Sequence, residues 1–300
     1  LYRHTTPGNF MVFSGAEEGI FVFMNAVLDP GHHIIVQFPC YQSLMEVARA
    51  IGCRVTPWVM DPGKNWELDI DFLEKSITPE TKAIVVNFPN NPTGYIPSLK
   101  NFQRIVEIAR QANIYLFSDE VYRFLEYREE DRLPAGCDEY EKGVSLGVMS
   151  KSFGLAGLRI GWIATRDRAL FEAIAAHKDY TTICSSAPSE FLATLALKNK
   201  ETILKRNLDI IGTNLGNLES FSRRFPGRFD WVKPKAGPLV FPRLVFTRDA
   251  EGFCLDLVKK KGVLLVPGNR FNYRDQYVRV GLGRKNMPEA LEKLGEYLSE

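Results

Sequence analysis

The chain has 300 residues, 45% of them hydrophobic and 25% charged, which is enough for about two domains with substantial cores and argues against disorder. Its 38 basic and 36 acidic residues nearly cancel, so no overall charge favours nucleic acid or an anionic membrane surface as a partner. No apolar stretch approaches the roughly 20 residues that a membrane helix needs, and small-molecule chemistry is the better expectation.

Short β-branched runs alternate with amphipathic helical runs in the first half of the chain. In chain order we expect a turn at 14–19 that opens a helix toward residue 28, then a strand at 34–37, a helix at 41–51, a strand at 54–59, a helix at 70–75, a strand at 83–87, a helix at 98–111, and strands at 114–118 and 144–149. Such alternation builds a mostly parallel sheet that is covered by helices on both faces, with ligands gathered at the carboxyl ends of the strands.

The pattern changes from about Glu201 onward. We expect a long helix at 201–225, strands at 229–232 and 239–245, a helix at 252–260, strands at 263–266 and 277–280, and a last helix from residue 288. Strand and helix are mixed here without strict alternation, which is typical of a smaller α+β domain. The sequence therefore predicts a large domain at 1–198 and a small C-terminal domain at 199–300.

The strand predicted at 144–149 leads into a run in which Lys151 stands eight residues before Arg159. A lone lysine is usually a solvated surface residue, so the run needs support from elsewhere. It resembles the Schiff-base lysine segment of the pyridoxal 5'-phosphate (PLP) aminotransferases of the class I/II superfamily, Ser-Lys-x-x-x-x-x-Gly-x-Arg-x-Gly. The resemblance implies that Lys151 holds PLP as an internal aldimine and, once displaced by a substrate amine, moves a proton as general base and acid.

Asp119 follows the strand predicted at 114–118, and Tyr122 stands three residues later. A carboxylate beside the pyridine nitrogen of PLP favours the pyridinium, which makes the ring an electron sink. The resemblance implies this role for Asp119, and a hydrogen bond from Tyr122 to the phenolic oxygen of PLP. The alternatives are an N-cap aspartate and an ordinary half-buried aromatic residue.

Asn91 opens the tetrapeptide Asn-Pro-Thr-Gly, shortly after the strand predicted at 83–87. The tetrapeptide is also a common turn sequence. In the family it is a signature, and the resemblance implies that Asn91 hydrogen-bonds the phenolic oxygen of PLP and approaches the substrate carboxylate.

The turn at 14–19 opens a helix, and backbone N–H groups at a helix start bind phosphate through their orphan donors and the helix dipole. The resemblance implies a phosphate cradle made of Gly15, Ala16, Glu17, Ser150 and Arg159. A capping box between Ser14 and Glu17 is the competing interpretation, since it satisfies the same donors. Family members often carry Ser or Thr where this chain has Val148, so one phosphate hydrogen bond is expected to be missing.

Two further residues match the family in the expected order. Tyr41 lies in a Pro-x-aromatic element, and the resemblance implies that its ring covers the pyridine face; packing in the core is the alternative. Arg279 interrupts an apolar strand, where an arginine needs an anionic partner and its fork suits a carboxylate. The resemblance implies that Arg279 binds the substrate α-carboxylate, and a solvent-facing residue on an edge strand is the alternative.

The five cysteines are scattered, with no Cys-x-x-Cys pair and no histidine at metal-ligand spacing. They indicate free thiols in a reducing cytosol, so we expect a cytoplasmic protein without a metal site. The glycines at 154, 157 and 161 lack the G-x-G-x-x-G spacing, and we reject a nicotinamide cofactor.

The resemblance covers residues 10 to 300. It implies a PLP-dependent transferase fold of the α/β class, with a mainly parallel seven-stranded sheet, helices on both faces and a smaller C-terminal α+β domain. It implies an aminotransferase that acts on an α-amino acid and a 2-oxo acid, as a homodimer with active sites at the interface. Another PLP reaction (β-elimination, decarboxylation or cyclisation) and a non-catalytic PLP-binding module are the alternatives.

Two departures from the family pattern concern substrate handling. Family members usually carry an N-terminal arm and helix before the phosphate loop, whereas nine residues precede the first strand predicted here; a fragment and a shortened enzyme with an open pocket are both compatible with this. The segment 235–238, Lys-Ala-Gly-Pro, stands where the family tends to have paired glycines near the mouth of the active site.

Overall fold

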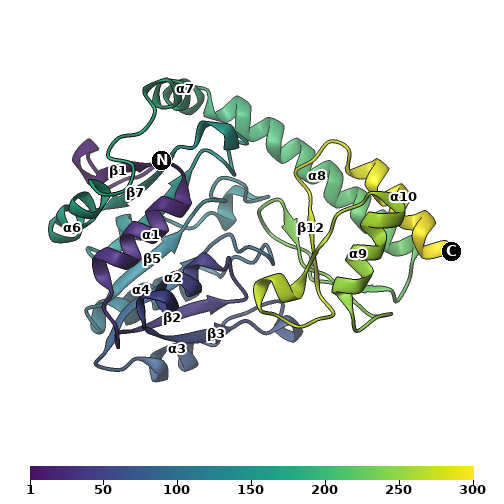
Figure 1. The fold of residues 1–300 in the computed structure, drawn as a ribbon, viewed down its shortest axis with the longest axis horizontal. Helices are drawn as coiled ribbons and strands as arrows, with labels where there is room; N and C mark the ends of the chain where they lie inside the picture. Colours follow the sequence, from purple (N-terminus) through teal and green to yellow (C-terminus); the bar gives the residue numbers. More distant parts are fainter.

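The computed structural model describes all residues from 1 to 300. A seven-stranded sheet forms the centre of the first part of the chain, in the spatial order β1, β7, β6, β5, β4, β2, β3 (Figure 1). Its strands are β1 (Phe10–Phe13), β2 (His33–Phe38), β3 (Arg54–Val59), β4 (Thr81–Asn87), β5 (Tyr115–Asp119), β6 (Gly143–Val148) and β7 (Gly161–Thr165). Only β7 runs against its neighbours β1 and β6, and the pairs from β6 to β3 are parallel. The mainly parallel seven-stranded sheet is therefore confirmed.

Helices cover both faces of this sheet (Figure 1). They are α1 (Ala16–Val27), α2 (Ser43–Ile51), α3 (Ile70–Ser76), α4 (Leu99–Gln111), α5 (Gly136–Glu139), α6 (Arg168–Lys178) and α7 (Ala187–Lys198). Successive strand side chains point to opposite faces, so a strand buried on both sides is apolar at every position. In β4, Ala83 and Val85 pack in one core with residues of α1, α2 and α6, while Ile84 and Val86 pack in the other with residues of α3 and α4.

The C-terminal part begins with the long helix α8 (Lys200–Arg224) and has two small antiparallel sheets. The remaining elements are β8 (Phe229–Asp230), β9 (Leu239–Val240), β10 (Arg243–Leu244), α9 (Ala250–Lys261), β11 (Val266–Pro267), β12 (Val278–Gly281) and α10 (Met287–Ser299). One sheet pairs β8 with β10, and the other has the order β11, β12, β9. A smaller C-terminal α+β part is confirmed.

Several predicted elements differ from the structure. The single strand predicted at 239–245 is wrong, because it is divided into β9 and β10 around Pro242, which has no N–H to give to a ladder. The strand predicted at 263–266 overlaps β11 only at Val266. The elements β7, α6 and α7 are not among those predicted. None of the helices combines the length and the apolar character that crossing a membrane requires.

The carboxyl ends of β4, β5 and β6 lie side by side in the sheet, and each leads into one of the predicted motifs. Asn87 ends β4 and pairs with Asp119, which ends β5. Lys151 follows the end of β6 by three residues. The fold thus brings the asparagine, aspartate and lysine motifs to one edge of the sheet, as expected for a parallel sheet.

Candidate active site

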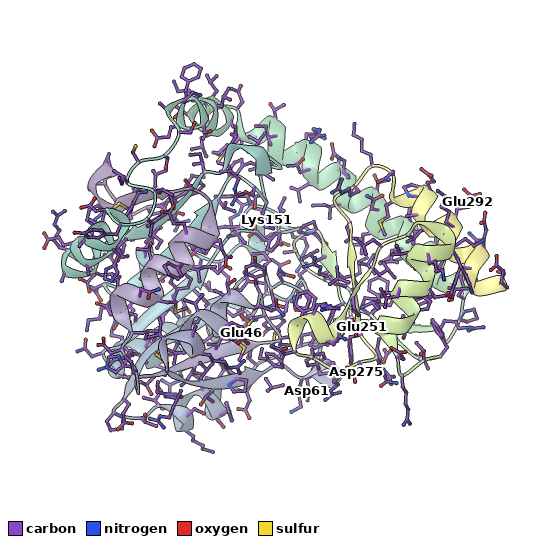
Figure 2. All side chains as sticks on the ribbon, in the orientation of Figure 1. Glu46, Asp61, Lys151, Glu251, Asp275 and Glu292 are labelled. Carbon is purple, nitrogen blue, oxygen red and sulfur yellow. The ribbon has the colours of Figure 1, made fainter.

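A pocket of about 240 Å³ opens at this edge of the sheet. Lys151 lies near the centre of the molecule, where the large sheet faces the C-terminal part (Figure 2). The pocket is lined by Ala16, Glu17, Ile20, Tyr41, Asn87, Asn91, Asp119, Val121, Tyr122, Val148, Ser150, Lys151 and Arg159. All predicted site residues except Gly15 and Arg279 therefore line one cavity, and these two contact residues that do.

Asp119 is a buried carboxylate that forms no ion pair. It is 3% exposed, and one of its oxygens accepts a hydrogen bond from the backbone N–H of Val121 at 3.1 Å. Burial raises the pKa of Asp119 to about 7, although the Val121 N–H and the Lys151 ammonium oppose the rise. Residues 121–124 form a turn and no helix follows, so the N-cap interpretation of Asp119 is wrong.

Lys151 faces this carboxylate across the pocket. Burial lowers the pKa of its amine, and the nearby Arg279 guanidinium lowers it further, while Asp119 acts in the opposite direction. The amine lies 6.0 Å from the ring centroid of Tyr122, which is buried, and burial raises the pKa of the Tyr122 phenol. The surroundings thus favour the neutral form of the Lys151 amine relative to an ordinary lysine, and they favour the protonated phenol of Tyr122.

Arg279 reaches the pocket from the C-terminal part. Its Nη1 donates a hydrogen bond to Oδ1 of Asn91 at 3.0 Å, which leaves the Asn91 Nδ2 without a hydrogen bond inside the protein. Arg279 lies in β12, the middle strand of its sheet, and is half-buried, so the edge-strand interpretation is wrong. Burial lowers the pKa of the guanidinium, as expected for a buried cation that has no carboxylate partner in the protein.

The start of α1 lies beside the Arg159 guanidinium. No side chain caps the helix, and the backbone of Gly15 has a φ of 96°. A Cβ at Gly15 would overlap the Arg159 guanidinium, so this position requires glycine on both counts. Nη1 of Arg159 donates to the Ser150 hydroxyl at 3.2 Å, and its Nη2 donates to the carbonyl of Ser14 at 3.4 Å.

The competing interpretation, a capping box between Ser14 and Glu17, is wrong. Glu18, one residue later, accepts the N–H of Ser14 at 2.6 Å instead, and the Glu17 carboxylate accepts the hydroxyl of Ser43. The first N–H groups of α1 consequently remain available beside Arg159. A helix start with open donors and an arginine next to it fits a phosphate group.

Tyr41 and Val148 form two walls of the pocket. Tyr41 is 41% exposed, so its interpretation as a core aromatic residue is wrong. Burial of its hydroxyl and the neighbouring Glu17 carboxylate raise the pKa of Tyr41. Val148 is buried and presents an apolar wall where the family often has a hydroxyl.

Sequence reasoning assigned no role to three lining residues. Asn87 donates from Nδ2 to the backbone carbonyl of Asp119 at 3.0 Å and accepts the N–H of Asn91 at 2.7 Å, so it links two motifs. Asn87 could have been predicted as a site residue, because a polar residue at the end of an apolar parallel strand lies at the edge of the sheet where ligands bind. Ile20 and Val121 carry no such signal, because apolar residues are expected throughout the core.

The pocket combines a lysine of lowered pKa, a buried acid without a cation and an arginine-flanked helix start at the strand ends of an α/β sheet. These are the features of an enzyme built around PLP, whose aldehyde, pyridine nitrogen and phosphate each need such a partner. The residues present therefore fit this cofactor.

Comparisons with known proteins agree with the site. The family model for aminotransferase class I and II matches residues 2–294. The capreomycidine synthase of Streptomyces vinaceus is 27% identical over 97% of this chain and 75% of its own length, and the aspartate aminotransferase of Thermotoga maritima is 26% identical over 99% and 77%. A solved PLP-dependent aminotransferase from Streptococcus suis 89-1591 has a TM-score of 0.93 and 33% sequence identity, and the match covers 99% of this chain and 79% of that one.

The chain belongs to the aminotransferase class I and II family. It is a PLP-dependent aminotransferase, and it acts on amino acids and 2-oxo acids. The other PLP reactions are not favoured by the comparisons, among which aspartate aminotransferases and a glutamate-pyruvate aminotransferase recur.

Proposed function

We propose that Lys151 is the residue that binds the cofactor aldehyde and moves the proton during reversible amino transfer between an α-amino acid and a 2-oxo acid. The observation that carries this assignment is the pairing, in one pocket, of Lys151 with the buried and unpaired Asp119. When bound, PLP supplies the aldehyde that takes up the substrate amine and the ring that withdraws electrons from the substrate Cα. With the cofactor bound, Lys151 Nζ would serve as the general base that accepts the Cα proton of the substrate and as the general acid that returns a proton.

Four other side chains orient the cofactor in this proposal. Asp119 hydrogen-bonds the pyridine nitrogen, and its raised pKa reflects the missing positive partner. Tyr122 and the free Nδ2 of Asn91 donate to the phenolic oxygen, since both are donors without an acceptor in the protein. Tyr41 lies over the ring at the exposed side of the pocket.

The phosphate binds at the start of α1. The backbone around Gly15, Ala16 and Glu17 supplies uncapped N–H groups, and Ser150 and Arg159 complete the cradle from the other side. The Glu17 side chain turns toward Ser43, so only its backbone N–H takes part.

Arg279 binds the α-carboxylate of the substrate. Its Nη1 is held by Asn91, and the rest of the guanidinium remains able to form a charge-assisted pair with an anion. The substrate carboxylate would form an ion pair with the Arg279 guanidinium, which has no carboxylate partner within the protein.

A Lys151→Ala variant tests the assignment. We expect the purified variant to lack the pH-sensitive near-visible absorbance of lysine-bound PLP and to lose amino transfer by about 10³-fold. Lys142→Ala is the control, since Lys142 is a half-buried lysine outside the pocket, whose amine donates to the carbonyl of Asn113 and lies over the Tyr115 ring. Full activity of the Lys151 variant would refute the assignment, and the release of ammonia or CO₂ without pyridoxamine phosphate would indicate another PLP reaction.

We also propose a homodimer with its active sites at the interface. Support comes from an exposed apolar region on α7 and the loop before it, where Tyr180 is 92%, Ile183 69% and Phe191 65% exposed. Thr181 and Thr182 of this loop bond Glu18 in the first turn of α1, so the region adjoins the phosphate site. Apolar patches of this kind on a folded chain mark interaction surfaces.

Two further assignments remain proposals. A boundary between domains at 198/199 is supported by the position of α8 after the last strand of the large sheet and before both small sheets. A cytoplasmic location is supported by the five free cysteines, of which only Cys184 is exposed.

A further inference from the structure

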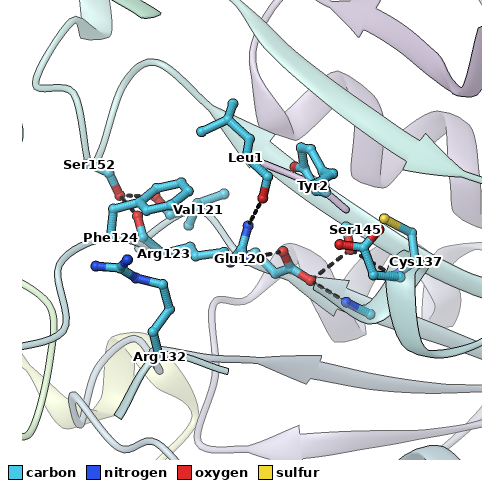
Figure 3. A network of polar contacts seen from close by, with 12 residues as sticks. Leu1, Tyr2, Glu120, Val121, Arg123, Phe124, Arg132, Cys137, Ser145 and Ser152 are labelled. Atoms are coloured by element: carbon cyan, nitrogen blue, oxygen red, sulfur yellow. Dashed lines mark hydrogen bonds and ion pairs between the residues drawn. The ribbon is translucent and has the colours of Figure 1, made fainter. Parts of the chain in front are cut away.

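Ser152, the residue after Lys151, joins the lysine segment to the loop that follows β5. It is 2% exposed, and its hydroxyl lies 3.0 Å from the carbonyl oxygen of Val121 and 2.6 Å from that of Arg123 (Figure 3). Tyr122 stands between these two carbonyls, and Asp119 stands two residues before the first. The one hydroxyl proton of Ser152 is thus shared by two carbonyls on the loop that carries the proposed cofactor contacts.

A second hydrogen bond holds the same residue from the opposite side. The carbonyl oxygen of Ser152 accepts Nδ2 of Asn207, in α8, at 2.8 Å. The backbone that follows Lys151 is therefore fixed both to the loop after β5 and to the long helix α8. A long lysine side chain has many rotamers, so a fixed backbone beside it reduces the positions that its amine can reach.

The loop after β5 has an anchor that does not involve Ser152. The carboxylate of Glu120 accepts the N–H of Gly136 at 2.8 Å and the hydroxyl of Ser145 at 2.7 Å (Figure 3). Asp119 itself belongs to β5 and is held by the sheet. Removal of the Ser152 hydroxyl would consequently free the lysine segment from this loop, while the loop keeps its place on the sheet.

We propose that Ser152 is a positioning residue, which sets the place of Lys151 Nζ relative to Asp119 and Tyr122 for attack on the cofactor aldehyde. Ser152 does not line the pocket, so it acts through Lys151. Effective attack requires the amine to lie close to the aldehyde carbon in the right direction, and a small misplacement lowers the rate strongly. The inference rests on the proposed role of Lys151.

The test compares two forms of the cofactor on cofactor-free Ser152→Ala protein. PLP forms a C=N bond with Lys151 Nζ and releases water, whereas pyridoxamine phosphate has no aldehyde and binds the same pocket without this bond. We expect the variant to capture PLP about tenfold more slowly in stopped-flow absorbance, with its dissociation constant for pyridoxamine phosphate within about twofold of the wild-type value. A purely structural role would weaken both equally.

Thr81→Val is the matched control. Thr81 is also buried, and its hydroxyl bonds His33 at 2.7 Å and the N–H of Thr78 at 2.8 Å, at the end of β4 farthest from the pocket. It should lose stability without a change in PLP capture. If Ser152→Ala does not fold, Asn207→Asp takes its place, because it removes the donor to Ser152 at a half-buried position, and we expect slower PLP capture with unchanged pyridoxamine phosphate binding.

The outcomes separate the two proposals. Capture of PLP by Ser152→Ala at the wild-type rate, or an equal loss for both cofactor forms, would overturn the role of Ser152. Failure of the wild-type protein to capture PLP would instead overturn the role of Lys151.

Discussion

Asp119 determines much of the chemistry of the pocket, because its buried carboxylate has no cation of its own. An asparagine at this position keeps the shape and the hydrogen bond but cannot carry the charge that stabilises a pyridinium. We expect Asp119→Asn to lower kcat of amino transfer by at least about 100-fold while PLP still binds. Steady-state kinetics together with a PLP titration measure both quantities.

Asp119 also lowers the stability of the folded, cofactor-free protein, by an amount that depends on pH. The pKa of Asp119 rises from its ordinary value of 3.8 to about 7 in the folded protein, so between these values the folded state binds more protons than the unfolded state. The stability of the cofactor-free protein therefore falls as the pH rises from 4 to 7, and the full cost is present above pH 7. We expect Asp119→Asn to stabilise the cofactor-free protein at pH 8, by at most about 4 kcal/mol, and to have no such effect at pH 3.5. A constant difference in denaturant unfolding across this pH range would contradict the raised pKa.

Arg279 gives a different kinetic signature. Replacement by glutamine removes the charge while it leaves a donor for Asn91, so the loss falls on the substrate carboxylate. We expect Arg279→Gln to raise KM for the amino donor by about 10- to 100-fold, with a smaller loss in kcat. An amine substrate without the carboxylate should be used equally by wild type and variant, and a preference of the wild type for it would count against the assignment.

Residues with a distinctive chemistry could be predicted from the sequence, whereas their supports could not. Lys151, Asp119 and Arg279 stand in apolar or strand-end contexts where their types are unusual; the first two line one pocket, and Arg279 contacts Asn91 in its wall. Ser152 and Glu120 follow two of these residues directly, yet serine and glutamate next to a motif have no preferred partner in sequence. Their contacts depend on which loops the fold places side by side.

At the scale of elements, the start of α1 is held by contacts of Glu18 with Ser14, Thr181 and Thr182, which we call the Glu18 clamp. The local sequence does not reveal these contacts. The Glu18 carboxylate accepts the N–H of Ser14 and the hydroxyls of Thr181 and Thr182, and Lys178 lies 3.9 Å away. A capping box was a reasonable local interpretation, but the loop before α7 supplies donors that outcompete it. The strands β2, β4 and β6, in contrast, could be predicted, because parallel strands that are buried on both faces are mostly apolar.

The Glu18 clamp should contribute to the free energy of unfolding in a way that depends on pH. Although burial raises the pKa of Glu18, hydrogen bonds from Thr181, Thr182 and Ser14 outweigh it and leave the pKa below its ordinary value of 4.5. The carboxylate therefore stabilises the fold above pH 4.5, and this contribution is lost as the pH falls through the folded pKa. We expect Glu18→Gln to lower the unfolding free energy at pH 7 by about 1–3 kcal/mol, and the difference should shrink toward pH 3.

Glu17→Gln is the comparison for this effect, because Glu17 is exposed in the same helical turn and its carboxylate accepts from Ser43 rather than from Ser14, Thr181 and Thr182. Chemical denaturation at several pH values measures both variants. An equal loss of stability in the two would show that the clamp adds nothing beyond the charge near the helix start.

For the whole molecule, the mainly parallel sheet and a pocket at its strand ends followed from the alternation of strand and helix, but the joining of the two parts did not. Arg279 meets Asn91 across 188 positions of sequence, and Asn207 meets Ser152 across 55. Such contacts depend on how the chain returns after α8, which runs away from the large sheet, so that β12 lies on the side of the C-terminal part that faces it (Figure 1). The resemblance placed Asn91 and Arg279 in one site, but no sequence signal connected Ser152 with Asn207, and only the fold shows which atoms meet.

Assembly of two chains is the last property to be tested at this scale. Phe191 lies in the exposed apolar region of α7, and a charge placed there must be desolvated if a second chain covers it. We expect Phe191→Asp to shift the protein from dimer to monomer in light scattering coupled to size exclusion, with little change in unfolding of the chain itself. Leu255→Asp is the control, because Leu255 is 66% exposed on α9 in the C-terminal part. Burial of an unpaired carboxylate in an apolar contact costs several kcal/mol, so a dimer that is built on this face should dissociate. A Phe191→Asp protein that remains dimeric, or a wild-type protein that is monomeric throughout, would therefore show that this region is not the interface.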